Sequence, residues 1–252
     1  MTMHHLGHTR SRRELDHLLQ APDTFVWAPL PGMTNATACV HAAPALGAGF
    51  LQYTTLLGAK GEFGVTPHSR FVYVLEGSLM LSQQGAPTTL HASSFAYLPP
   101  RSTHTIASGE LGARVVVIEK PYVSLLANQL PPVVVGIEHD IAGTALMGDD
   151  AVQVRTLLPA DALYDFAVNT MEYQPGASLP MVESHVMEHG LLMLEGEGIY
   201  RLGDAWYPVA KGDFIWMAPF CPQWFAAIGK TPARYLIYKN WNRNPLAEVS
   251  PR

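Results

Sequence analysis

The sequence predicts an all-β protein made of two tandem barrels of short antiparallel strands, preceded by a short N-terminal helical arm. Two observations lead to this prediction. First, the chain is rich in turn-forming residues, with 21 glycines and 20 prolines in 252 residues, and its apolar runs are about four to eight residues long. Second, several motifs recur at one fixed spacing. Short strands without intervening helical patterns pair antiparallel, and this favours a sandwich or small barrel.

The repeat has a spacing of 119 residues. Leu-Glu-Gly occurs at residues 75–77 and again at residues 194–196. The same offset separates the segment FAYLPP, which begins at Phe95, from FIWMAP, which begins at Phe214. Lys120 and Lys239 form a third pair. One unchanged offset along this length of chain indicates a duplicated domain.

The repeat divides the chain into four predicted parts. These are an arm over residues 1–22, an N-terminal lobe over 23–120, a linker over 121–150 and a C-terminal lobe over 151–252. In the arm, Arg10, Arg12 and Arg13 open the segment RSRRELDHLLQ, whose amphipathic pattern predicts a short helix. The linker contains prolines and shows no clear periodicity.

Composition argues against several classes of partner. The formal net charge is -5, whereas nucleic acid and anionic membranes call for a basic surface, so we expect neither as a partner. No segment resembles a signal peptide or offers the roughly 18 successive apolar residues of a membrane span, so we expect a cytoplasmic protein. Cys39 and Cys221 lie in apolar surroundings and predict no disulfide. Exposed barrel edges favour a homo-oligomer.

One segment of the C-terminal lobe carries residues suited to a metal. Glu183 and His185 are two residues apart, so they share one face of a strand, and His189 has the same parity. Gln223 can join them from the strand that follows the turn at Pro219. A carboxylate, two imidazoles and an amide oxygen, without a thiolate, suit Mn²⁺ or Fe²⁺ better than structural Zn²⁺.

These positions resemble the two sequence motifs of the cupin superfamily, whose fold is the double-stranded β-helix or jelly roll. Four ligand positions of the motifs are matched by Glu183, His185, His189 and Gln223. Gly196 follows at the spacing of the first motif, and Gly212 opens the second. Ala218 and Phe220 replace the proline and glycine of the second motif, which suggests a slightly different turn.

The repeat supplies an internal comparison. Positions 119 residues before the four candidate ligands hold Gly64, Thr66, Arg70 and His104. Only His104 retains a possible ligand, and one histidine cannot hold a metal tightly. The N-terminal lobe is therefore predicted to lack a metal site.

A closer resemblance is to the (S)-ureidoglycine aminohydrolase family, which consists of two-lobed cupins. It is carried by ESHVMEHG with a glutamine in place of the last histidine, by GIYRL, and by ARYLIYKNWNR. The resemblance implies Mn²⁺ on the four ligands, with Fe²⁺ or Zn²⁺ possible. It also implies catalytic roles for Lys239, Tyr235 and Glu183, and substrate contacts from Tyr200, Tyr235, Lys239 and Gln223.

The implied activity is hydrolysis of a small ureido compound. (S)-Ureidoglycine would lose ammonia to give (S)-ureidoglycolate, a step in purine and allantoin catabolism. Strand periodicity independently places Tyr235 and Lys239 on one face. Two other hypotheses remain at this point: an Fe-dependent cupin dioxygenase or other small-molecule cupin enzyme, and a non-enzymatic, ligand-sensing two-lobed cupin.

Overall fold

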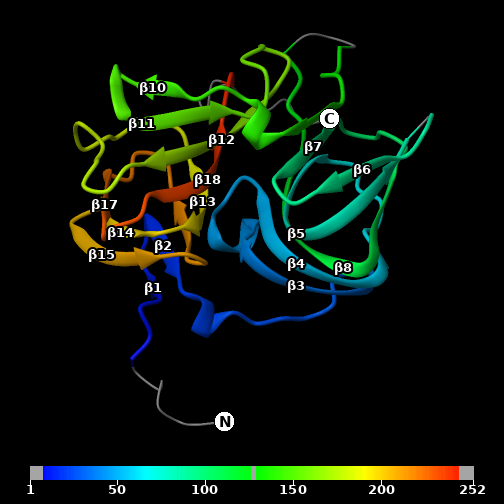
Figure 1. The fold of residues 1–252 in the computed structure, drawn as a ribbon, viewed down its shortest axis with the longest axis horizontal. Coiled ribbons are helices and arrows are strands. Elements are labelled where there is room, and N and C mark those ends of the chain that lie inside the picture. The colour runs from blue at the N-terminus through cyan, green and yellow to red at the C-terminus, as the bar shows by residue number, and fades with distance from the viewer. Residues whose placement is uncertain (1–7, 84, 126–128, 244–252) are drawn as a thin grey trace.

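The computed structural model describes residues 8–83, 85–125 and 129–243, and these residues are mostly β-strand (Figure 1). They form eighteen strands and three short 3₁₀ segments, with no α-helix in the described part of the chain. The predicted all-β class is confirmed. Among the same residues, no helical segment has the length and apolar character needed to cross a membrane.

The first half of the chain forms one seven-stranded antiparallel sheet, ordered β3-β4-β8-β5-β7-β9, with β6 paired to β5. Its strands are β3 (Thr34–Ala42), β4 (Leu51–Glu62), β5 (Ser69–Ser82), β6 (Thr88–His91), β7 (Ser94–Leu98), β8 (Thr105–Lys120) and β9 (Val134–Ile137). The long strands β4, β5 and β8 have register shifts between residues 57 and 62, 74 and 76, and 77 and 79. Such irregularities bend strands, so one sheet can curl around its own apolar core.

The strands of the second half, together with two short strands from near the N-terminus, form two antiparallel sheets. One has eight strands in the order β1-β2-β16-β13-β18-β12-β11-β10, and the other has three in the order β15-β14-β17. The strands are β1 (Arg12–Arg13), β2 (His17–Gln20), β10 (Thr144–Leu146), β11 (Asp149–Thr156), β12 (Phe166–Tyr173), β13 (His189–Glu195), β14 (Glu197–Leu202), β15 (Ala205–Ala210), β16 (Phe214–Met217), β17 (Gln223–Ile228) and β18 (Ala233–Asn240). Their inner faces share one buried cluster.

Alternation along β13 and β18 separates two cores. Leu191 and Tyr235 point into the cluster between the two sheets of the second half. Leu192, Leu236 and Tyr238 point the other way, into a cluster shared with the first half. There the ring of Tyr238 stacks on Phe50, with 4.0 Å between the ring centroids. The same two strands therefore form one wall of the second-half interior and the contact between the halves.

The glycines of the repeated Leu-Glu-Gly motif have the same unusual backbone conformation. Gly77 and Gly196 have positive φ angles of 77° and 70°. A Cβ atom at these positions would lie 2.2 Å from the Gly112 carbonyl oxygen and 2.4 Å from that of Pro232. Both positions therefore require glycine, which explains why the motif recurs.

The predicted helical arm is wrong. Residues 12–13 and 17–20 of the arm form β1 and β2, and β2 pairs antiparallel with β16 near one edge of the eight-stranded sheet. Residues 1–7 of the predicted arm lie outside the described part of the chain. Leu15, Leu18 and Leu19 have helical spacing, but burial follows a period of two, because His17 and Leu19 are buried and Leu18 is less so. The hydrogen bonds offered by the open edge of β16 outweigh a weak local preference for helix.

Two leucines of the same segment test whether it forms a strand. Leu19 is fully buried, whereas Leu15 is fully exposed. We expect Leu19→Ala to lower the free energy of unfolding by about 2–5 kcal/mol, because it leaves a cavity in the core. Leu15→Ala should change it by less than about 0.5 kcal/mol. Denaturant unfolding measures both, and equal losses would contradict the strand assignment, since a helix would bury the two leucines together.

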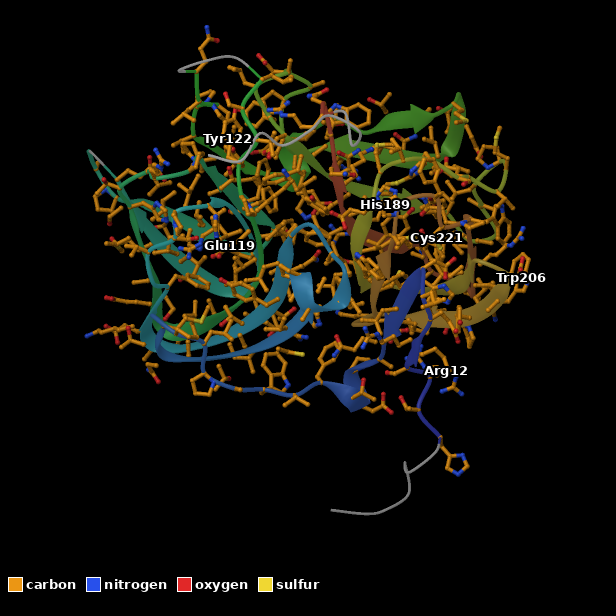
Figure 2. All side chains as sticks on the ribbon, turned by 180° about the vertical axis from the view of Figure 1, so that it is seen from behind. Arg12, Glu119, Tyr122, His189, Trp206 and Cys221 are labelled. Atoms are coloured by element: carbon orange, nitrogen blue, oxygen red, sulfur yellow. The ribbon has the colours of Figure 1, made fainter. Side chains whose placement is uncertain are left out.

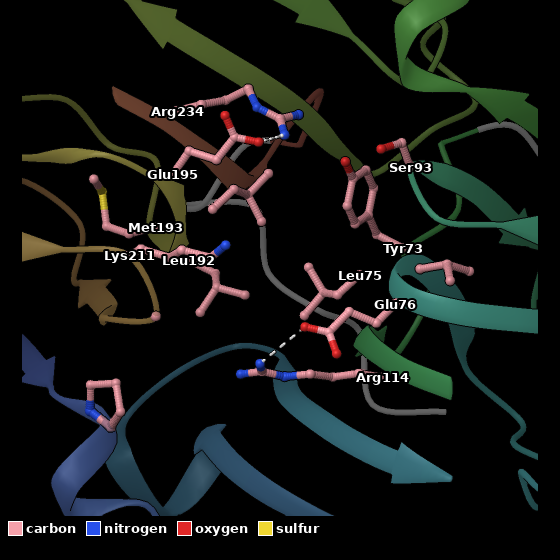
Figure 3. A pocket seen from close by; sticks show the side chains of 14 residues that line it. Tyr73, Leu75, Glu76, Ser93, Arg114, Leu192, Met193, Glu195, Lys211 and Arg234 are labelled. Carbon is pink, nitrogen blue, oxygen red and sulfur yellow. Dashed lines mark hydrogen bonds and ion pairs between the residues drawn. The ribbon is translucent and has the colours of Figure 1, made fainter. Parts of the chain in front are cut away.

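Residues 121–150 connect the halves and hold a buried ion pair. β9 joins the first-half sheet beside β7, and β10 joins the second-half sheet beside β11. Between them, Glu138 is fully buried and accepts hydrogen bonds from Arg234 of β18, at 2.6 and 2.5 Å, and from Tyr73 of β5. Burial alone would raise the pKa of Glu138, but these hydrogen bonds hold it below its usual value. Arg234 also pairs with Glu195 beside a cavity of about 430 Å³ between the halves (Figure 3).

Breaking this pair should destabilise the protein strongly. We expect Arg234→Met to lower the free energy of unfolding by about 3–5 kcal/mol, because it leaves the Glu138 carboxylate buried without its cation. Lys60→Met is the matched control, since Lys60 and its partner Glu110 are both exposed, and it should cost less than about 1 kcal/mol. Thermal and urea unfolding provide the comparison. A loss for Arg234→Met as small as that of the control would show that the buried pair does not hold the halves together.

Candidate metal centre

A cavity of about 250 Å³ lies between the two sheets of the second half. The residues that the sequence singled out all line it: Glu183, His185, His189, Tyr200, Gln223, Tyr235 and Lys239. They come from β13, β14, β17, β18 and the segment that precedes β13. Figure 2 shows His189 within the second half and Glu119, which lies in the corresponding interior of the first half, well away from it. Segments separated by up to 56 residues in sequence thus meet in one interior.

Backbone pairing positions Glu183 beside Gln223. The two residues form an isolated bridge in which each backbone N–H donates to the other's carbonyl oxygen, at 2.8 and 2.9 Å. His185 is held in the same way, because its carbonyl oxygen accepts from the Phe220 N–H at 2.7 Å. The segment that carries the first two candidate ligands is therefore attached to the chain that leads into β17.

His185 is at the centre of the candidate ligand set. Its Nε2 atom lies 3.3 Å from His189 Nε2, 2.9 Å from the Gln223 amide and 3.9 Å from a Glu183 carboxylate oxygen. His185 Nδ1 is buried and has no hydrogen-bond partner among the described residues. The other three candidate ligands thus each lie close to His185 Nε2. Among the described residues, however, no set of ligand atoms from Glu183, His185 and His189 has all its members within 4.8 Å of one another.

His189 is held in the form that a metal ligand requires. Its Nδ1–H donates to the Tyr238 carbonyl oxygen at 3.1 Å, which directs the Nε2 lone pair toward His185. Burial lowers the pKa of His189 to about 3, with help from the charges of His185 and Lys239. The imidazole is therefore neutral at physiological pH.

The donor set fits a divalent cation. Glu183 contributes a carboxylate, the histidines contribute two imidazole nitrogens, and Gln223 can turn its amide oxygen toward them, since the two ends of an amide are assigned from their neighbours. In the present orientation Gln223 Oε1 accepts from the Tyr200 hydroxyl at 3.4 Å. Such a mixed set of oxygen and nitrogen donors suits Mn²⁺ or Fe²⁺.

Lys239 and Tyr235 supply hydrogen-bond donors to the same cavity. Lys239 pairs across the strands with His189, and its ammonium lies 5.3 Å from the centre of the Trp241 ring. Burial lowers the pKa of Lys239, while the charge of Glu183 acts in the opposite direction. The Tyr235 hydroxyl lies 2.8 Å from that of Tyr173, and burial raises its pKa well above the usual value, so it remains neutral.

The structure also adds cavity residues that sequence reasoning missed. Asn169 and Met171 of β12, Met187 beside the ligands, and Trp241 after β18 line the same space. The parity of Asn169 and Met171 within AVNTMEY matches that of one strand face. Parity alone did not say which face of that strand is internal, so neither residue could be selected.

The equivalent interior of the first half holds an ion pair. Arg70, which the repeat aligns with His189, donates to Glu119 at 2.8 Å and to the Gly64 carbonyl oxygen at 2.8 Å. Its guanidinium also lies 3.4 Å from His104 Nε2, and burial lowers the pKa of His104, with Arg70 adding to the effect. A protein cation thus lies among the residues equivalent to the candidate ligands.

Another group of ligand-type residues is less suited to a metal. Asp16, His17 and Cys221 have ligand atoms within 4.8 Å of one another. However, both ring nitrogens of His17 are already hydrogen-bonded, to Asp16 at 2.8 Å and to the Tyr207 hydroxyl at 2.9 Å. Cys221 is a buried thiol whose pKa is raised to about 12, mainly by burial. This cluster fastens the arm strand β2 to the second half.

The chain is similar to known proteins along most of its length. A family model described as a cupin domain matches residues 169–238. The chain is 42% identical over 243 residues to the (S)-ureidoglycine aminohydrolase of Arabidopsis thaliana. The aligned region covers 95% of this chain and 80% of the relative. It is 31% identical over 232 residues to the enzyme of that name from Escherichia coli strain K12, covering 90% and 88%. The solved structure of protein Ylba from E. coli has a TM-score of 0.84 at 27% identity and covers 99% of this chain and 100% of that one.

Proposed function

Because the chain belongs to the (S)-ureidoglycine aminohydrolase family, we propose that it converts (S)-ureidoglycine to (S)-ureidoglycolate and ammonia with the help of one bound Mn²⁺ ion. The observation that carries the proposal is the position of His185 Nε2, close to the donor groups of the other three candidate ligands. Glu183, His185, His189 and Gln223 would hold the cation. The reaction would be one step in the breakdown of purines through allantoin.

The covalent structure of the substrate favours loss of its amine. Its central carbon bears an amine, a ureido nitrogen and a carboxylate, so the ureido lone pair can help to expel the amine. The carbon–amine bond breaks as the amine gains a proton, and a water molecule then adds its oxygen to that carbon and releases a proton. When bound, the cation would polarise substrate oxygen atoms and act as a template for the handedness of the product.

Side chains of the chain would bind the substrate and move the proton. The ammonium group of Lys239 lines the cavity. It would give a proton to the leaving amine, or pair with the substrate carboxylate. Tyr235, held by Tyr173, would donate a hydrogen bond to a substrate oxygen. Apolar lining such as Ile237 and Leu179 would limit the water that reaches the reacting carbon.

We also propose that the two lobes have different roles. The N-terminal lobe, residues 23–120, would act as a scaffold, since an arginine occupies its interior, and the C-terminal lobe, residues 151–252, would carry the chemistry. The exposed apolar side chains of β9, Val135 and Ile137, support a homo-oligomer. The net charge of -5 supports a small-molecule substrate over nucleic acid. The free, buried thiols of Cys39 and Cys221 support a reducing, cytoplasmic setting.

Metal content tests the ligand set. Purified chain reconstituted with Mn²⁺ and desalted should retain about one ion per chain, measured by atomic emission and by electron paramagnetic resonance. His185→Ala should lose tight binding, because it removes the donor nearest to the other three. His104→Ala, in the first half, should leave the metal content unchanged. Retention of the ion by His185→Ala would place the metal elsewhere.

Ammonia release from freshly generated ureidoglycine tests the activity. We expect Mn²⁺ to stimulate release and the rate to be the same with and without oxygen, as a hydrolase requires and a dioxygenase does not. Lys239→Met should lower kcat by about 10²–10⁴-fold with its metal content intact, because proton transfer to the leaving amine is lost. The control is Lys230→Met, on an exposed turn. A rise in KM with unchanged kcat would instead assign Lys239 to the carboxylate, and no release by the wild type would refute the proposed function.

A further inference from the structure

Asn169 is a buried polar residue in the cavity for which the proposed mechanism has no role. It lies on β12 among mainly apolar neighbours, and only 6% of its surface is exposed. Its side-chain oxygen Oδ1 is buried and has no hydrogen-bond partner among the described residues. Leaving such an acceptor unpaired costs about 1–3 kcal/mol, so a partner is expected when the cavity is filled.

Strand register places Asn169 next to the substrate-facing residues of β18. Asn169 is directly opposite Ile237, while the neighbouring pairs on the same face join Ala167 to Lys239 and Met171 to Tyr235. Its side chain therefore lies between the levels of Lys239 and Tyr235, and diagonal neighbours across a strand pair are within reach of long side chains. All of these β18 residues line the cavity with Asn169.

The chemistry of the surrounding groups indicates what Asn169 would bind. Lys239 and the Tyr235 hydroxyl are donors that suit substrate oxygen atoms, and the acceptor groups of Glu183 and Gln223 belong to the candidate metal set. The Oδ1 atom of Asn169 is thus a free acceptor for an N–H group. The ureido group keeps its N–H donors throughout the reaction, whereas the amine departs.

We propose that Asn169 is a specificity residue whose Oδ1 atom accepts a hydrogen bond from the ureido N–H of the substrate. This inference rests on the proposed function, because it takes a ureido compound as the ligand. A site that pairs a buried acceptor with a substrate N–H rejects analogues without that donor more strongly than an apolar pocket does. Asn169 would therefore separate ureido acids from simple 2-hydroxy acids.

The test uses two stable probes on the Mn²⁺-loaded protein. Ureidoacetate carries the ureido group and the carboxylate but no amine, and glycolate carries the carboxylate without the ureido group. Isothermal titration calorimetry of both probes should show that Asn169→Leu weakens ureidoacetate about 10- to 100-fold and leaves glycolate within about twofold. Asn169→Ala should weaken the binding of ureidoacetate in the same way. Because alanine is smaller than asparagine, this variant shows that the effect is not due to the bulk of leucine.

Metal content and the midpoint of thermal unfolding are measured for each variant to confirm that the site is intact. Val154→Ala, an apolar position of the same cavity, is the matched control and should change the two probes equally. Equal weakening of both probes by Asn169→Leu, or no weakening of either, would overturn the inference. Ammonia release by the wild type is scored separately. An active wild type with unchanged ureidoacetate binding in Asn169→Leu refutes only this inference, whereas an inactive wild type whose ureidoacetate binding depends on Asn169 refutes only the proposed reaction.

Discussion

The site depends on strands β13 and β18, which are packed on both faces. One face of this pair contacts the first half through Leu192, Leu236 and Tyr238, and the other face carries His189 and Lys239 into the cavity. Because side chains alternate with a period of two, a shift of one residue would exchange these faces. The apolar contact between the halves therefore also sets the direction of the ligand and the ammonium group. This contact gives the first half a part in the geometry of the cavity.

Much of the architecture could be predicted from the chain, because its signals are local. Short apolar runs indicated strands, and the recurring Leu-Glu-Gly motif indicated a duplicated domain, whose two glycines both have positive φ angles. The spacing of Glu183, His185 and His189 predicted a common strand face. This strand assignment is wrong for Glu183 and His185, which lie in the segment before β13, yet all three residues line one cavity. Gln223 was selected from its place after the turn at Pro219 and from the motif resemblance. Its contact with Glu183 is a non-local backbone bridge that spacing alone could not reveal.

The parts that could not be predicted depend on non-local pairing. The leucines of the arm have helical spacing, yet β2 is set by the unpaired edge of β16, nearly 200 residues away in sequence. Residues 121–150 have no clear period, yet they supply β9 to one sheet and β10 to another, because each finds an open edge. Asn169 was missed because one polar residue in an apolar strand gives no local sign that it faces a cavity.

The placement of β2 also has consequences for biosynthesis and for attempts to divide the molecule. The ribosome makes this strand about 200 residues before β16, whose edge it covers. Until β16 is made, the nascent segment lacks its hydrogen-bonding neighbour, and the sheet gains β2 only by closing a loop of nearly 200 residues. A fragment that begins after the first half would expose the backbone of β16, and such an uncovered edge readily recruits a strand from another molecule.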